Sequence, residues 1–433
     1  MQSLEGFRKS GVFTVGSTPG LAGDLVLDGE STSLDLHSKE FFTTVELPDG
    51  CILGALHNLT KVSLHGCVTT EGPGRGHNGT EEYHFSKVFP HFVLFGRQHL
   101  KPVSAEVTHV SFSVSDGYVI FNDFAAFGQV TRNRQEHMEL VAKAELEHGR
   151  QLSVGDHPFL FYFSGKYEIL SAKTAVGTVS ATHAPSYSSP GPRGIKVENK
   201  IRVNIDFDAP IDVDGAIRKV LMLLRFLEIV AGRKQRVEQL TILTAAEGGG
   251  HCPLDVYWSM NSPGAQSSDS SRGPNSYDLP IQAAREPAVF SAILTRWVDR
   301  DAELLASRAR FSTAFGHQRS YNVDRLVGAA NMFDILPTSV VPSDVQLTHD
   351  MEDARAKARI LFKALPVSPE RDSVLGVLGR LGQASLKQKV RSRAAVVTQR
   401  AGAKFPELEL VVDEAVNCRN HFVHGSGTKM DYE

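Results

Sequence analysis

The segment VVDEAVNCRNHFVHG at residues 411–425 carries Arg419 and, five residues later, His424. A guanidinium can grip a phosphate with two parallel hydrogen bonds. An imidazole can take up or release a proton near neutral pH. Metal-free RNA cleavage needs both abilities. The arginine would hold the scissile phosphate, and the histidine would take the 2′-OH proton or protonate the leaving 5′-oxygen.

The residues before this pair predict a helix with one apolar stripe. The stripe consists of Leu408, Val411, Val412, Ala415 and Val416. Its next position is Arg419, and an arginine there costs several kcal/mol unless it is paired or faces a polar cavity. Gly425 is expected to end the helix. Asn420 and His424 share a face, whereas His421 points roughly the other way.

The spacing alone leaves two interpretations open. In the first, Arg419 and His424 form a catalytic site. In the second, Arg419 is a structural residue that pairs with Asp413 or Glu414. A related question concerns Asn331 and Asp334, two polar positions on an otherwise apolar predicted helix. They could line a cleft or serve as a helix-end cap or exposed face, and we favour the latter.

The elements that must position this pair follow two patterns along the chain. From residue 11 to about residue 180, short segments alternate apolar and polar residues between turn residues, which predicts strands. The segments 201–207 and 237–245, and the one from residue 254, predict further strands. Between them, a helix is expected from about 215 to 232, capped by Asp212 or Asp214 and ended by Gly232.

After residue 260 the pattern changes. Residues 261–278 are small, polar and rich in proline and glycine, which predicts a flexible linker. Residues 279–433 show apolar spacing of three and four, which predicts helices. We therefore expect an α+β multidomain protein, with a mainly-β N-terminal domain at residues 1–260 followed by an all-α helical bundle at 279–433.

The charge distribution singles out one basic segment. The chain of 433 residues has a net charge of −3, but residues 351–400 hold 11 Lys/Arg and 4 acidic residues, a local net charge of +7. A basic segment can face nucleic-acid phosphates, although a solvated helix face is the alternative. Four of its side chains are our candidates for contact with the RNA backbone: Lys387, Lys389, Arg391 and Arg393.

Other motifs fail on their context. Four cysteines (Cys51, Cys67, Cys252 and Cys418) form no CxxC pair, so we expect no disulfide framework and no zinc site. GRGHNG at 74–79 matches a dinucleotide fingerprint but lacks the strand and helix that such a site needs, and we interpret it as a flexible loop between strands. The carboxylates of 206–215 lack the calcium-loop spacing. We expect neither metal nor cofactor.

The chain shows no targeting signal and no membrane segment. The N-terminus has no apolar signal region. The most apolar run, at 220–232, is interrupted by Arg225 and Glu228 and predicts a buried helix. A cytoplasmic protein without membrane contact is therefore expected.

Three segments resemble a known family. CRNHFVHG at 418–425 resembles the R-x4-6-H signature of the HEPN superfamily. Residues 11–38 resemble the opening of the N-terminal β domain of ApeA-like proteins, and residues 327–337 resemble a helix near the active site of their HEPN domains. By this resemblance, Arg419 is the phosphate-binding arginine, Asn420 its polar neighbour and His424 the catalytic histidine.

ApeA-like proteins are bacterial anti-phage abortive-infection RNases. The resemblance implies a metal-independent endoribonuclease acting on host or phage RNA, with tRNA as the expected class. It also implies a homodimer that pairs two HEPN domains, and a β domain that senses a phage trigger or positions RNA. The alternative is a non-catalytic HEPN module for dimerisation, RNA binding or sensing. HEPN domains normally continue into a further helix, so we expect a C-terminus that is truncated or unusually short.

Overall fold

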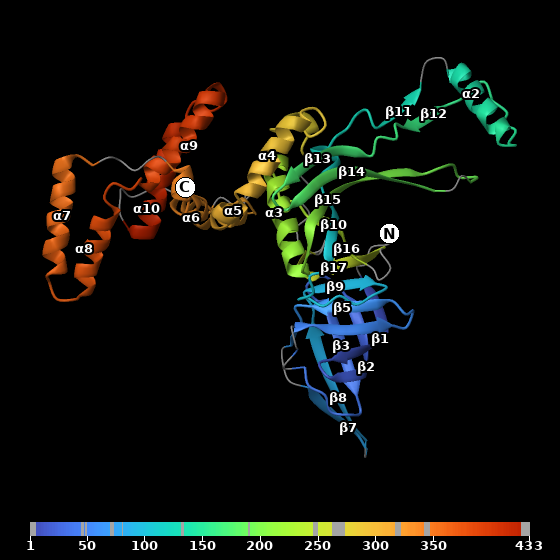
Figure 1. Ribbon diagram of the computed structural model, residues 1–433, viewed down its shortest axis with the longest axis horizontal. Coiled ribbons are helices and arrows are strands. Elements are labelled where there is room, and N and C mark those ends of the chain that lie inside the picture. The colour runs from blue at the N-terminus through green and yellow to red at the C-terminus, as the bar shows by residue number, and fades with distance from the viewer. Residues whose placement is uncertain are drawn as a thin grey trace. The chain divides into compact units, whose positions relative to one another are not determined.

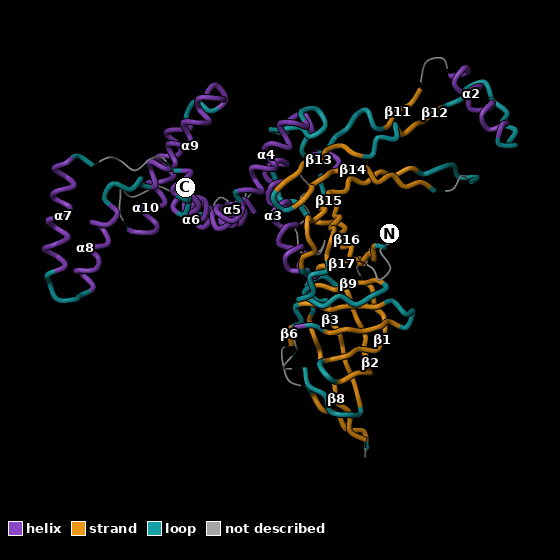
Figure 2. The backbone as a smooth tube through the Cα atoms, in the orientation of Figure 1, coloured by secondary structure: helices purple, strands orange, loops and turns teal. Residues whose placement is uncertain are grey.

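The computed structural model describes residues 6–44, 47, 50–69, 73–79, 81–130, 134–188, 191–245, 250–261, 273–316, 322–341 and 347–425. The chain divides into two compact units, Met1–Asp299 and Arg300–Glu433. The first unit is built mainly of strands and the second of helices (Figure 2). The predicted order, a β-rich region followed by an all-helical region, is confirmed.

A single sheet of 15 strands forms the frame of the first unit (Figure 1). Its order is β13-β14-β15-β10-β16-β17-β9-β5-β4-β1-β2-β3-β8-β6, with β7 paired to β8, and neighbouring strands run antiparallel. The strands are β1 (Phe7–Val15), β2 (Thr18–Leu27), β3 (Ser33–Ser38), β4 (Ile52–Leu56), β5 (Lys61–His65), β6 (Val68–Thr69), β7 (Gly74–Asn78), β8 (Glu81–Phe89), β9 (Phe92–Gly96), β10 (Val107–Val114), β13 (Glu168–Thr174), β14 (Gly177–Tyr187), β15 (Val197–Ile211), β16 (Val237–Ala245) and β17 (His251–Trp258).

Alternation along the strands builds two apolar cores. In β14, every second residue from Gly177 to His183 is buried, as expected where successive side chains point to opposite faces. One core lies among β1–β5, β8 and β9, with Phe13, Leu25 and Leu34 fully buried. The other contains side chains of β10 and β13–β17 together with those of two helices.

Those two helices are α3 (Val213–Ala231) and α4 (Pro287–Asp299). The Asp212 side chain accepts a hydrogen bond from the Gly215 N–H at 2.6 Å and so caps α3. Gly232 ends the helix at φ +70°, a conformation that favours glycine. Both predicted signals are confirmed, and the apolar run of 220–232 is largely buried in this core.

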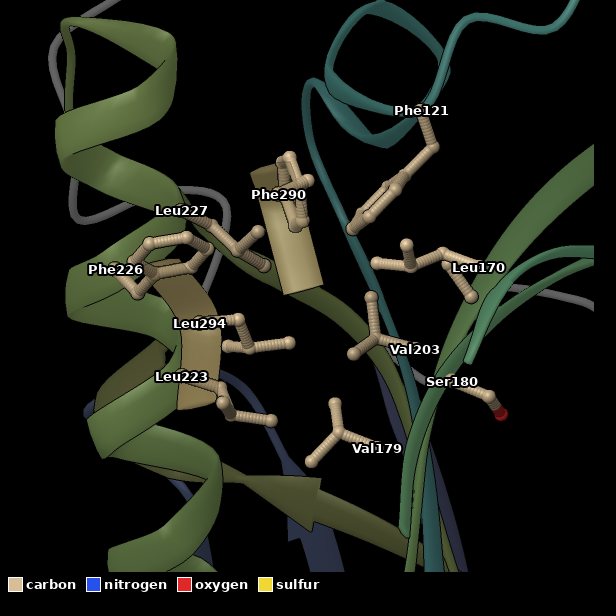
Figure 3. Close-up of a pocket in the computed structure, with 11 residues that line it drawn as sticks. Phe121, Leu170, Val179, Ser180, Val203, Leu223, Phe226, Leu227, Phe290 and Leu294 are labelled. Carbon is tan, nitrogen blue, oxygen red and sulfur yellow. The ribbon is translucent and has the colours of Figure 1, made fainter. Parts of the chain in front are cut away.

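The core between the two helices and the sheet is tightly packed. Leu223 and Leu294 lie opposite Val179 and Val203 of the strands (Figure 3). The cavity between them is about 10 Å³ and is lined by apolar groups, room for about one water molecule. The space is part of the packing and offers no ligand site.

Two segments of the first unit differ from the sequence prediction. Residues 134–147, expected to be extended, form helix α2 (Arg134–Glu147), because this segment is rich in strong helix formers and lacks alternation. Residues 74–78, expected to be a flexible loop, form β7. Its Gly76 pairs with Tyr83 of β8, whose ring occupies the space that a side chain at position 76 would fill. Outside the main sheet lie α1 (Gly117–Ile120) and a separate pair, β11 (Phe127–Val130) and β12 (Leu160–Phe163).

The two units divide later than the predicted linker at 261–278. Residues 262–272 lie outside the described part of the chain, and Ser276–Asp278 form the 3₁₀ turn η4. Helix α4 belongs to the first unit because Phe290, Leu294 and Val298 enter its core. The sequence grouped α4 with the other helices because its apolar spacing is the same as theirs.

The second unit consists of helices with strong start signals. Asn322, Thr348 and Ser368 each accept a hydrogen bond from the backbone of the helix that follows, and Ser385 forms a capping box with Gln388. The helices are α5 (Asp301–Gly316), α6 (Val323–Asp334), α7 (His349–Lys363), α8 (Pro369–Arg380), α9 (Leu386–Ala401) and α10 (Leu408–His424), with 3₁₀ turns η5 (Thr338–Val340) and η6 (Gly402–Lys404).

Packing in the second unit is centred on α6. This helix contacts α5, α9 and α10, and α9 also contacts α10, while α7 and α8 pack on each other. Small or apolar side chains form the contacts, including Ala330 of α6, Val390 and Ala394 of α9, and Val416 of α10, all buried. This arrangement places the polar ends of α6 and α10 side by side.

Candidate active site

Helix α10 presents Arg419 toward α6, as its position on the apolar stripe predicts. Val416, one turn earlier, is 4% exposed, and the Arg419 side chain is 12% exposed. The helix ends at Gly425, which has φ +65° and donates its backbone N–H to the His421 carbonyl at 2.8 Å. His424 is therefore the last helical residue, and it is exposed.

Two polar residues of α6 receive the guanidinium. Nη2 of Arg419 donates to Asn331 Oδ1 at 3.0 Å and to Asp334 Oδ2 at 2.9 Å. Asn331 and Asp334 are three residues apart and therefore share a helix face. From sequence we favoured a helix-end cap or exposed face for these two residues. Asp334 does lie exposed at the end of α6, Asn331 is half-buried, and both side chains also bind Arg419.

The other terminal nitrogen of Arg419 contacts residues of its own helix. Nη1 donates to Asn420 Oδ1 at 3.1 Å and lies 3.2 Å from His424 Nε2. The structure thus brings together Arg419, Asn420 and His424, the three residues that the sequence proposed as catalytic, and adds Asn331 and Asp334 to them.

The contact with Arg419 matches one tautomer of the neutral His424 ring. A guanidinium has only donors, so Nε2 of His424 must accept the hydrogen bond. The neutral ring then carries its proton on Nδ1 and has its lone pair on Nε2. An exposed imidazole in this tautomer can accept a proton from a substrate hydroxyl once Nε2 is released.

The pairing of Arg419 with Asp413 or Glu414, considered as a structural alternative, does not occur. The Asp413 carboxylate turns instead to α9, where Arg391 Nε donates to Oδ1 at 2.7 Å and Lys387 Nζ lies 3.3 Å from Oδ2. The hydrogen bond from Arg391 lowers the pKa of Asp413, and the hydrogen bond from Lys387 and the charges of both cations add to the effect. This contact joins α9 to α10.

The four basic candidates of α9 therefore fall into two groups. Lys387 and Arg391 pair with Asp413. Lys389 donates to the backbone carbonyl of Asp334 at 2.9 Å, which places it beside the Arg419 cluster. Arg393 is exposed, follows Lys389 by one turn on the same face, and makes no ion pair with any residue that the structure describes.

His421 does not belong to the cluster. Its ring contacts Phe422 edge-on at 5.6 Å, and its buried Nδ1 has no hydrogen-bond partner among the described residues. This agrees with the helical spacing, which turned His421 away from Asn420 and His424. Among the residues that sequence reasoning left aside, Asn331 and Asp334 carried one usable signal, a polar pair on an otherwise apolar helix.

The described part of the chain lacks two further kinds of feature. It contains no cluster of three or more His, Cys, Asp or Glu side chains arranged to hold a metal ion. None of its helices is long and apolar enough to cross a membrane.

Comparison with known protein families identifies a match for the first unit. A family model described as ApeA N-terminal domain 1 matches residues 8–297, more than half of the chain and nearly all of the first unit. No curated protein and no solved structure matches the chain.

Proposed function

The chain belongs to the ApeA N-terminal domain 1 family, and from this premise we propose that it is a metal-independent endoribonuclease of anti-phage defence. The proposed chemistry resides in the second unit, at Arg419 and His424. The observation that carries it is the 3.2 Å contact between Arg419 Nη1 and His424 Nε2 at the exposed end of α10. This contact sets a phosphate-binding group beside a proton acceptor.

In the proposed reaction, Arg419 binds a non-bridging oxygen of the scissile phosphate and stabilises the charge that develops there. His424 Nε2 takes the proton from the 2′-OH, whose oxygen attacks the phosphorus and expels the 5′-oxygen. The P–O5′ bond breaks as the new O2′–P bond forms, and the leaving 5′-oxygen takes a proton from water, so the products are a 2′,3′-cyclic phosphate and a free 5′-OH. Asn420, which also contacts Arg419, helps to orient the guanidinium.

The basic side chains nearest to this site support a role in holding the RNA backbone. Lys389 borders the Arg419 cluster, and Arg393 extends the same face of α9. Lys387 and Arg391 are engaged with Asp413, so we assign them a smaller part. We propose tRNA as the substrate class and a phage component as the trigger, both on the resemblance to ApeA-like RNases.

We also propose a homodimer through the second unit. Large apolar side chains on α10 and just before it are exposed, among them Phe405, Leu410 and Val411. Burial of such side chains against a second copy would be favourable. Light scattering coupled to size exclusion checks this, with Leu410→Glu expected to shift the protein toward the monomer.

The second candidate function is a non-catalytic module in which Arg419 serves only the packing of α6 against α10. One observation favours it, namely that the four terminal N–H groups of Arg419 all have acceptors within the protein. A purely structural role, however, gives no reason for an exposed histidine to be the fourth acceptor.

The test is the chemistry of the products. Purified protein is incubated with total tRNA in EDTA, and the fragment ends are analysed. Discrete fragments with 2′,3′-cyclic phosphate and 5′-OH ends, absent when the 2′-OH at the mapped cleavage site is replaced by hydrogen, support the proposal. Fragments with 3′-OH ends, or cleavage that persists at the deoxy position, contradict it.

A further inference from the structure

The Arg419 guanidinium is fully engaged within the protein. Nη1 contacts Asn420 and His424, and Nη2 contacts Asn331 and Asp334. The remaining nitrogen, Nε, is buried and has no hydrogen-bond partner among the described residues. A phosphate can therefore reach the terminal nitrogens only if one of the four present acceptors leaves.

Asp334 is the acceptor whose place a phosphate can best take. It is the only anion among the four, and a carboxylate and a phosphodiester present the same kind of charged oxygen to a guanidinium. Its side chain is 37% exposed, against 12% for Arg419, so it borders the solvent from which an anion would enter. Asn331, in contrast, is half-buried and neutral.

The position of Asp334 strengthens this assignment. It is the last residue of α6, where the helix dipole disfavours a negative charge. Two cations from other helices compensate, since Arg419 of α10 binds the carboxylate and Lys389 of α9 binds the backbone carbonyl. If the carboxylate turned into solvent, Arg419 would lose the anionic partner that it now has, while Lys389 would stay at the neighbouring backbone carbonyl.

We propose that Asp334 is an intramolecular substitute for the substrate phosphate, which holds Arg419 in place in the free protein and must be displaced before RNA is cleaved. This inference rests on the proposed function for the identity of the anion as RNA. The displacement of Asp334 by an anion is a property of the site that can be measured without cleavage.

Asp334→Asn separates the two roles of the side chain. The amide keeps an oxygen that can accept from Arg419 Nη2 but removes the competing charge. The ion pair between Asp334 and Arg419 is partly exposed and therefore weak. Without the Asp334 charge to compete for Arg419, an added anion is expected to bind about 2- to 5-fold more tightly. Asp324→Asn is the matched control, because it removes the same charge from an exposed position of the same helix, ten residues away.

The experiment measures dissociation constants for two probes by calorimetry, inorganic sulfate and a mixed-sequence 2′-O-methyl RNA oligonucleotide, which cannot be cleaved because its 2′-oxygens are blocked. The full chain is used as wild type, Asp334→Asn, Asp334→Glu and Asp324→Asn, each checked for folding by circular dichroism. Tighter binding of both probes by Asp334→Asn alone is the expected result, with Asp334→Glu close to wild type.

Binding by Asp334→Asn that equals that of wild type or Asp324→Asn overturns the inference, and so does weaker binding, which would show that Asp334 only positions Arg419. These outcomes remain distinct from failure of the proposed function. Tighter sulfate binding without RNA cleavage by any variant supports the displacement and contradicts the RNase. RNA cleavage together with unchanged anion binding by Asp334→Asn supports the RNase and contradicts the displacement.

Discussion

Nη1 of Arg419 and Nε2 of His424 lie 3.2 Å apart at the end of one helix. Since the guanidinium can only donate, this contact leaves the neutral histidine with its lone pair on Nε2. Asn331 and Asp334, 88 and 85 residues earlier in the chain, hold the other arginine nitrogen. Two helices thus orient one arginine toward one exposed imidazole.

Arg419→Lys keeps the positive charge but removes the planar guanidinium, whose two terminal nitrogens contact four acceptors. An ammonium cannot contact α6 and His424 in the same geometry. We expect RNA cleavage to fall by about 10²-fold or more, measured as single-turnover rate. Arg359→Lys, at an exposed position of α7, is the matched control, and a rate for Arg419→Lys near that of wild type would show that charge alone suffices at position 419.

Gly425→Ala tests the termination of α10. Gly425 has φ +65°, and a Cβ added there meets no atom within 4 Å, so the cost arises from the backbone alone, about 1 kcal/mol. We expect a lower free energy of unfolding in urea and slower cleavage, because the last turn carries His424. Gly376→Ala, within α8 and equally unobstructed, should instead stabilise the protein. Equal effects of both changes would contradict this account of the helix end.

The contact of Asp413 with Arg391 and Lys387 predicts a pH dependence. The pKa of Asp413 is lower in the folded protein than in the unfolded chain. Its contribution to stability is therefore fully present above the unfolded value of about 4 and is lost as the pH falls through that value and the lower folded pKa. Thermal melts of wild type and Asp413→Asn should differ at neutral pH and converge in acid. Melts that differ equally at all pH values would contradict the assignment.

Phe290→Ala tests whether α4 belongs to the first unit. The Phe290 ring is buried, with its centroid 5.8 Å from that of Phe121 and 5.5 Å from that of Phe226. Its removal should destabilise the first unit by about 3–5 kcal/mol. Hydrogen exchange of the β-sheet amides measures this loss of stability. Val289→Ala, at an exposed position, should have little effect. If the second unit alone lost protection, α4 would belong there.

The sequence predicted the elements well where the pattern is local. Asp212 and Gly232 bound α3 as expected, and alternation predicted most strands. Arg419 also stood out locally, since an arginine on an apolar stripe needs a partner. The identity of that partner was not predictable from α10, because Asp334 reaches Arg419 through tertiary packing and Asp413, its near neighbour, pairs with α9 instead.

The assignment of α4 failed for a related reason. Apolar spacing shows that a helix has a buried face but does not show which core receives it. By residue type alone, Phe290 and Leu294 could enter the core of the first unit or that of a helical bundle. Their packing with α3 and the sheet assigns them to the first unit. The rings of Tyr83 and Phe85 in β8 cover Gly76 and Gly74 of β7, a fit between paired strands that a glycine-rich sequence does not reveal.

The cleavage rate of His424→Ala in EDTA tests the central claim most directly. The substrate is the RNA cleaved by wild type, and the control is His349→Ala, which removes an exposed histidine at the start of α7. Removal of a general base typically lowers a rate by about 10²- to 10⁴-fold. We predict a loss of this size for His424→Ala and none for His349→Ala, with all three proteins equally folded by circular dichroism. Cleavage by His424→Ala at the wild-type rate would contradict the claim that the Arg419–His424 pair performs the reaction.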